Sequence, residues 1–204
     1  MKKDIYELTT LALFVAIIIL LSAVPVLGYI PLGAINATTI HIPVIIGAAI
    51  LGWKEGAFLG GVFGITSIIK NTVQPNATSF LFSPFIPVFG TDEGSFFAII
   101  LALVPRILIG ITAYLAFIAF KKAKTPIRFA ISGFIGSMTN TLLVMGGIVL
   151  FFGESYSAAN GIAYDTLIAT VFSIITGSGF IEAVAAAVIC SAVGTVLLKE
   201  MKHK

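Results

Sequence analysis

Long apolar runs are the feature that most restricts what this chain can fold into. The first, residues 5–26, carries a single charged residue, Glu7, and about 20 apolar residues in a helix cross the hydrocarbon core of a bilayer. This run is too long for the core of a signal peptide and lacks a small-residue cleavage signature, so we expect it to be retained. Because only 10% of the residues are charged, too few to cover a soluble domain, the chain is predicted to be an all-α integral membrane protein.

Six transmembrane helices in a single domain, residues 1–204, account for these runs. Segments rich in glycine, proline or polar residues separate them, including 28–36 and 52–56. The run 166–198 is too long for one upright helix, and we expect a break at Gly177-Ser178-Gly179. The predicted helices span about residues 5–27, 39–52, 57–70, 95–120, 128–152 and 180–198.

The distribution of charge predicts how this bundle is oriented. Ten of the twelve basic residues fall in the segments 1–4, 53–56, 121–128 and 199–204, which six helices place on one side. Because basic residues are enriched in cytoplasmic segments, both termini are expected in the cytoplasm of a prokaryotic cell membrane. Splitting the last apolar run into two spans would place the lysine-rich tail outside, so a seven-helix arrangement is rejected.

The two remaining basic residues, Lys70 and Arg106, are expected in the outer half of the bundle. A charge inside a membrane requires a partner or a water-filled cavity. Glu182, near the outer end of the last predicted helix, could form a structural ion pair with Arg106. Alternatively, all three groups line a polar cavity open to the outside, and their excess of positive charge would then favour a small anionic solute.

The long connection 71–94 could cover such a cavity, because it combines neutral polar side chains with four phenylalanines. It could also be an ordinary loop that inserts aromatic rings among lipid headgroups. Asn140 is expected midway along a helix, where a bond between helices is as reasonable as ligand contact. The residues predicted to contact the ligand are Asn36, His41, Lys70, Asn71, Asn76, Arg106, Asn140 and Glu182.

Motifs for catalysis, nucleotide binding and metal binding are missing from the sequence. There is no P-loop, no paired-carboxylate signature and no histidine–cysteine cluster with metal-ligand spacing. We therefore expect no cofactor and no metal. A small membrane enzyme, such as a lipid-modifying one, remains the alternative class, but a binding subunit driven by partner proteins fits better.

Several segments resemble the substrate-binding (S) subunits of energy-coupling factor (ECF) transporters. The most specific is HIPVIIGAAILG followed by GAFLGGVFGITS, and VPRILIGITAYL and GSMTNTLLVMGGIVLFFG extend the likeness over most of the chain. Among the subfamilies, the pantothenate-specific S subunits are the most similar. The resemblance implies a six-helix, S-component-like bundle with an outward-facing pocket, and high-affinity binding of a small water-soluble vitamin.

The resemblance also implies partners. A transmembrane coupling subunit and two ATPase subunits would drive import, so the chain itself would not be an enzyme. Ala12 and Ala16 match the Ala-xxx-Ala motif that docks on the coupling subunit, although small residues four apart also serve packing within a protein. Hydroxymethylpyrimidine, pyridoxine, folate and riboflavin are the alternative ligands.

Overall fold

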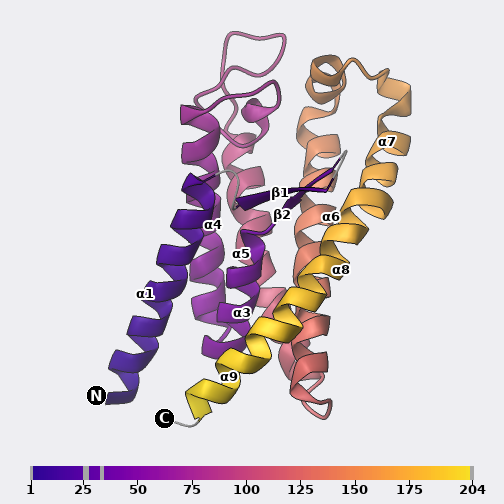
Figure 1. Ribbon diagram of the computed structural model, residues 1–204. Helices are drawn as coiled ribbons and strands as arrows, with labels where there is room; N and C mark the ends of the chain where they lie inside the picture. Colours follow the sequence, from indigo (N-terminus) through magenta and orange to yellow (C-terminus); the bar gives the residue numbers. More distant parts are fainter. Residues whose placement is uncertain (1, 25–27, 33–34, 203–204) are drawn as a thin grey trace.

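The computed structural model describes residues 2–24, 28–32 and 35–202, and these form six helices and one β-hairpin (Figure 1). The last helix is a continuous rod whose parts are α7, α8 and α9. The helices and their parts are α1 (Lys2–Ala23), α3 (His41–Leu51), α4 (Trp53–Val73), α5 (Phe97–Ala119), α6 (Thr125–Asn160), α7 (Leu167–Ile174), α8 (Phe180–Ile189) and α9 (Thr195–Lys202). Five of the six are long and apolar enough to cross a membrane, which confirms the predicted all-α membrane fold.

The helix α3 is the exception in length. Its 11 residues rise about 16 Å, roughly half the thickness of the hydrocarbon core. The antiparallel strands β1 (Tyr29–Leu32) and β2 (Ile35–Thr38) precede it, and the hairpin lies above its first turn (Figure 1). The chain after α1 therefore turns back into the bundle, and α3 completes only the half near the termini.

Both ends of the described chain lie at the same end of the bundle (Figure 1). The lysine-rich turn between α5 and α6 lies there too, whereas the acidic loop between α4 and α5 lies at the opposite end. This separation agrees with the predicted arrangement of charged segments.

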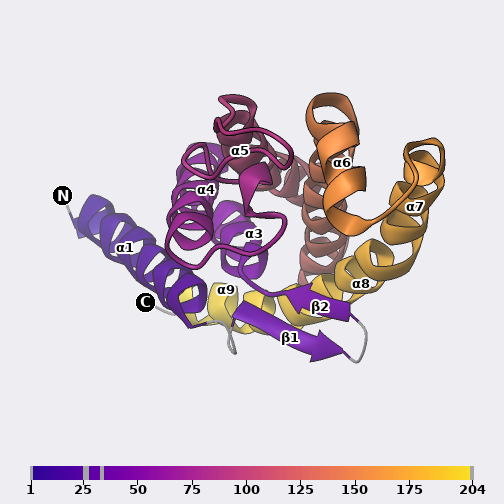
Figure 2. The ribbon, with the colours of Figure 1, turned by 90° about the horizontal axis from the view of Figure 1, so that it is seen from above.

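Two apolar clusters hold the helices together, one in each half of the bundle. Along α5, Leu101 belongs to the cluster away from the termini and Ile109 belongs to the cluster near them. Along α6, Ile148 belongs to the cluster away from the termini and Phe129 to the cluster near them. Between these positions, Arg106 of α5 and Asn140 and Thr141 of α6 line a gap between the two clusters. Seen from above, the helices form an arc, and the hairpin closes its open side (Figure 2).

Several predicted boundaries need correction. The break at Gly177-Ser178-Gly179 is wrong, because Ile175–Gly179 forms a π-helix that keeps the chain helical from α7 into α8. A second π-helix, Cys190–Gly194, joins α8 to α9. Wider turns of this kind keep backbone groups hydrogen-bonded, which a true break inside a membrane would not. The last helix is thus much longer than the predicted 180–198.

Two other helices also extend beyond their predicted ends. The helix expected to end at residue 152 is only kinked at Phe152, where φ is −136°, and α6 continues to Asn160. The expected polar turn over residues 52–56 is a single residue, Gly52, whose φ of 127° reverses the chain between α3 and α4. The segment predicted to interrupt the chain at 28–36 holds most of the hairpin. The predicted end of the first helix, residues 25–27, lies outside the described residues.

Candidate ligand-binding cavity

A cavity of about 460 Å³ occupies the gap between the two apolar clusters. This volume lies within the range of pockets that enclose small organic molecules. Its lining residues come from the second half of α4, the loop that follows it, the middle of α5 and α6, and the end of β2, and also from the end of α7, the π-helix after it and the first turn of α8. All of these segments lie in the half of the bundle that faces away from the termini (Figure 1).

Arg106 provides the deepest positive charge of the cavity. Its side chain is only 6% exposed, and Nη1 donates a 2.7 Å hydrogen bond to the backbone oxygen of Leu101. In a regular helix that oxygen would accept from residue 105, but Pro105 has no N–H to donate. The arginine thus satisfies the acceptor that the proline leaves open, and this bond fixes the guanidinium at the cavity wall.

Two aromatic rings also hold the Arg106 guanidinium in place. The Cζ atom lies 4.7 Å from the ring centre of Phe82, in the loop after α4, and 5.5 Å from that of Phe63 in α4. Both distances are within the range of cation–π attraction. Because these rings exclude water from part of the guanidinium, a carboxylate that reached Arg106 would meet a partly dehydrated partner.

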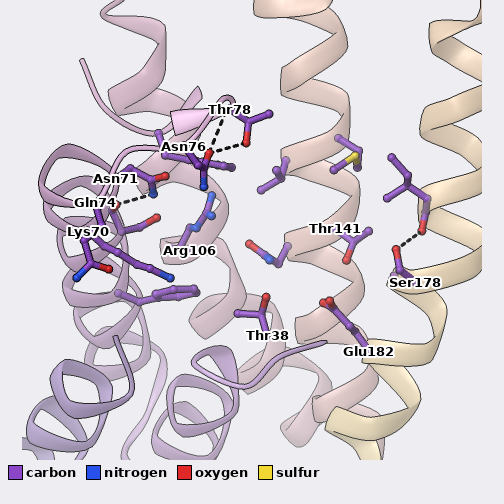
Figure 3. Close-up of a pocket in the computed structure, with 18 residues that line it drawn as sticks. Thr38, Lys70, Asn71, Gln74, Asn76, Thr78, Arg106, Thr141, Ser178 and Glu182 are labelled. Atoms are coloured by element: carbon purple, nitrogen blue, oxygen red, sulfur yellow. Dashed lines mark hydrogen bonds between the residues drawn. The ribbon is translucent and has the colours of Figure 1, made fainter. Parts of the chain in front are cut away.

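The charges on the cavity wall are divided between its two sides (Figure 3). Lys70 and Arg106 stand on the side formed by α4 and α5, and Glu182 on the side formed by α8. Thr38, at the end of β2, lies beside Glu182 on this wall (Figure 3). The hairpin therefore borders the acidic wall, while the proline-associated turn of α5 fixes the basic wall.

The loop after α4 is shaped by its own polar side chains. Asn71 donates to the Ser67 oxygen at 2.8 Å and accepts from the Ser79 hydroxyl at 2.9 Å. That hydroxyl also accepts from the Asn76 backbone amide, while the Asn76 side-chain oxygen accepts both the backbone N–H and the hydroxyl of Thr78. These bonds hold the loop at the cavity in one conformation.

The four phenylalanines of this loop have different roles. Phe82 lines the cavity, and Phe80 packs against Phe152 of α6 with 5.9 Å between ring centres. Phe85 and Phe89 are exposed, at 74% and 49%. One ring therefore lines the cavity, one anchors the loop, and two are exposed on its surface.

The structure brings six of the eight predicted contact residues to the cavity, namely Lys70, Asn71, Asn76, Arg106, Asn140 and Glu182. Asn36 lies on β2, and its side chain falls outside the described part of the chain. His41 is only 2% exposed in the first turn of α3 and does not line the cavity. Arg106 and Glu182 approach from opposite walls (Figure 3), as the cavity interpretation requires.

His41 lies below the floor of the cavity. A β-carbon at Gly136 of α6 would stand 2.8 Å from Ile45 of α3, and one turn further along each antiparallel helix His41 comes level with Asn140. Among the described residues, the two ring nitrogens of His41 and the Oδ1 atom of Asn140 have no hydrogen-bond partner. Buried polar atoms of this kind are usually satisfied by water or ligand, and of the two residues only Asn140 lines the cavity.

Sequence reasoning missed several residues of the wall, among them Ser67, Ser178 and Met145. Ser67 precedes Asn71 by one helical turn, and Ser178 precedes Glu182 by one turn. The i, i+4 spacing was a usable signal for Ser67. For Ser178 it was hidden by the break predicted at 177–179.

Ala12 and Ala16 lie on the exposed surface of α1, whereas Phe14 and Ile18 face the core at 6% and 0% exposure. The two alanines therefore do not take part in packing among the described helices. A strip of small side chains on the outer surface of a membrane helix lets another helix approach closely.

Comparison with known proteins agrees with this architecture. Residues 6–194 match the family described as ECF transporter, substrate-specific component. The chain is 37% identical over 190 residues to the pantothenic acid transporter PanT of Lactococcus lactis subsp. cremoris, covering 89% of this chain and 95% of that one. It is 29% identical over 195 residues to the pantothenate transporter PanT of Leuconostoc mesenteroides subsp. mesenteroides, with coverage of 91% and 88%. The family match spans nearly the whole chain, and the protein belongs to the substrate-specific components of ECF transporters.

Proposed function

We propose that this chain is the pantothenate-binding subunit of an ECF-type importer. The observation that carries the proposal is the division of the cavity into a basic wall, with Lys70 and Arg106, and an acidic wall with Glu182. Two relatives that carry the name of pantothenate transporters support the same ligand. As a member of a family of transport subunits, the chain binds a small molecule within the membrane and is not an enzyme.

Pantothenate suits this division of charge because its own polar groups are divided. It carries one carboxylate at one end, two hydroxyls at the other and an amide between them. A carboxylate held by a partly dehydrated arginine gains a charge-assisted hydrogen bond worth about 1.5–3 kcal/mol. The carboxylate would therefore bind at Arg106, with Lys70 as the second cation.

The hydroxyl end would then lie against the opposite wall. The Glu182 carboxylate can accept hydrogen bonds from hydroxyls, and it would repel a second carboxylate at this end of the ligand. Thr141 and Ser178, which line the same wall, offer hydroxyl groups as further partners. The cavity would thus distinguish the two ends of the molecule and admit it in one orientation.

Import would need partner subunits. We infer a transmembrane coupling subunit that docks on Ala12 and Ala16, and two ATPase subunits that supply energy. The exposure of both alanines on α1 supports such docking, and their position in the half near the termini leaves the cavity free.

The ligand assignment is tested with the intact purified protein. Molecules that co-purify after gentle extraction are identified by mass spectrometry, and pantothenate and its carboxamide are titrated by calorimetry. We expect pantothenate to be recovered, and the carboxamide to bind about ten- to a hundredfold more weakly, since each 1.4 kcal/mol is a factor of ten. Recovery of a neutral pyrimidine, or equal affinity for acid and amide, would contradict the proposal.

Both termini would lie in the cytoplasm, because the basic turn between α5 and α6 lies at their end of the bundle. A cysteine introduced at Thr91, in the acidic loop, should react with an impermeant thiol reagent in intact cells. One at Lys122 should react only after the cells are opened. The reverse labelling pattern would mean that the protein has the opposite orientation in the membrane, with the cavity facing the cytoplasm.

A further inference from the structure

A second hollow, of about 320 Å³, lies on the seam between α1 and α4. It is formed by the last two turns of both helices, in the half of the bundle away from the termini (Figure 1). Four of its lining residues are apolar or methyl-bearing and four are polar. They are Ile19, Ala23, Ile69 and Val73, and Ser22, Thr66, Lys70 and Gln74.

The apolar side of this hollow faces the membrane. Ile19, Ile69 and Val73 are 49%, 55% and 71% exposed, and both α1 and α4 are long enough to cross a bilayer. Large apolar side chains exposed on such helices contact lipid. The hollow is therefore open to the hydrocarbon tails rather than to water.

The polar residues of the hollow form two groups, a hydrogen-bonded pair of hydroxyls and two longer side chains at one end. The Ser22 hydroxyl donates to the Thr66 hydroxyl at 3.0 Å, which in turn donates to the Phe63 oxygen at 2.9 Å. These two hydroxyls therefore have hydrogen-bond partners within the protein and do not require a polar ligand. Lys70 and Gln74 stand at the other end, next to the loop that leaves the membrane.

We propose that this hollow binds an anionic phospholipid. One acyl chain would lie along Ile19, Ile69 and Val73, and the phosphate would meet Lys70 and Gln74 where α4 ends. An apolar trough that ends in a cation matches the order of groups in a lipid, and a lysine near a helix end extends toward the headgroups. A soluble anion would gain nothing from the lipid-facing walls.

The lipid site adjoins the ligand cavity and shares its cation, Lys70, with it. Lys70 and Gln74 line both hollows, but the other lining residues of the lipid site line only this one. The proposal therefore holds whichever vitamin the protein carries, and its test requires no vitamin.

Native mass spectrometry of the full-length protein, purified and incubated with phosphatidylglycerol or phosphatidylcholine of equal chain length, tests the site. We expect phosphatidylglycerol to be retained roughly fivefold more strongly, as one lysine–lipid charge contact would give. Ile69→Trp should abolish this preferential retention by filling the trough. Ile65→Trp is the matched control, since Ile65 lies on the same helix with 53% exposure and does not line the hollow. Lys70→Gln should reduce retention of phosphatidylglycerol to that of phosphatidylcholine.

Two results would overturn the proposal. Equal retention of both lipids by the wild type would mean that the cation does not select the headgroup. Equal retention by Ile69→Trp and Ile65→Trp would mean that lipid merely coats the helices. If thermal unfolding shows that Ile69→Trp is misfolded, Val73→Trp replaces it, because Val73 is 71% exposed and a larger side chain there meets little protein.

Discussion

Gly60 of α4 packs directly on the backbone oxygen of Arg106 in α5, so that a β-carbon at Gly60 would overlap that oxygen. The close approach of these two helices therefore depends on the missing side chain. It also ties the position of the buried arginine to α4, which carries Lys70. The basic wall of the cavity is thus a single packed unit formed by two helices.

Replacing Gly60 by alanine should destabilise the protein by about 1–3 kcal/mol, the usual cost of overpacking. Ligand affinity should fall as well, because the backbone that carries Arg106 must move. Gly61→Ala is the control, since a β-carbon there meets nothing within 4 Å and alanine favours a helix by up to about 1 kcal/mol. Thermal unfolding in detergent and calorimetry measure both effects. If the two variants unfold at the same temperature, the packing has been misinterpreted.

Arg106→Gln should weaken pantothenate binding by about one to two powers of ten through loss of the charge-assisted bond. The carboxamide of pantothenate should bind wild type weakly and lose little more in the variant. Lys70→Gln should show the same pattern only if Lys70, and not Arg106, holds the carboxylate.

Folding must be compared first, because Arg106 also satisfies the Leu101 oxygen. Arg106→Lys keeps the charge and should recover part of the affinity. Wild-type affinity in folded Arg106→Gln and folded Lys70→Gln alike would show that the cavity has no anion site, and a neutral ligand would then be the better candidate.

Glu182→Gln should reduce affinity by about five- to tenfold, because hydrogen bonds to a charged acceptor are roughly 1 kcal/mol stronger than those to a neutral one. Glu154→Gln, at an exposed site in the same half of the bundle, should leave affinity unchanged. Calorimetric titration of both variants makes the comparison. Tighter binding by Glu182→Gln would mean that this carboxylate repels the ligand instead of receiving its hydroxyls.

Bulky side chains at Ala12 and Ala16 should block uptake by cells while the isolated subunit still binds its ligand. Both alanines are exposed on α1, so tryptophan there would obstruct a partner helix without disturbing the described core. Leu13→Trp, at a neighbouring site that is 60% exposed, should preserve uptake. Parallel loss of binding and uptake in the alanine variants would point to a structural role for the strip.

Apolar runs and charge placement predicted the fold well, because a membrane leaves few options for 20-residue apolar segments. They could not predict whether an apolar run forms one continuous helix or two helices. Glycines at 177 and 179 resemble a chain break in sequence, yet the backbone remains hydrogen-bonded through a π-helix. The hairpin also escaped prediction, because its strands have only four residues each and β1 is apolar throughout and contains a proline.

The ionisable cavity residues were predictable for a physical reason. A charged side chain such as Arg106 or Glu182 inside an apolar helix is costly to expose to lipid, so it usually faces a polar cavity or a charged partner. Neutral residues gave a weaker signal, because Ser67 and Ser178 are as common in helix contacts as in ligand sites. The bond from Arg106 to Leu101 could have been anticipated from Pro105, which leaves an acceptor open four residues earlier.

The π-helix before Glu182 has a consequence for how this wall can change. A π-turn accommodates one extra residue within an α-helix, so removing one residue from Ile175–Gly179 would return this stretch to regular α-turns. Ile174 and Glu182 would keep their places on the wall, whereas the widened turn that carries Ser178 and Gly179 to the cavity would be lost. A single-residue deletion here, more than a substitution, would therefore reshape one part of this wall while α4 and α5 keep the opposite wall in place.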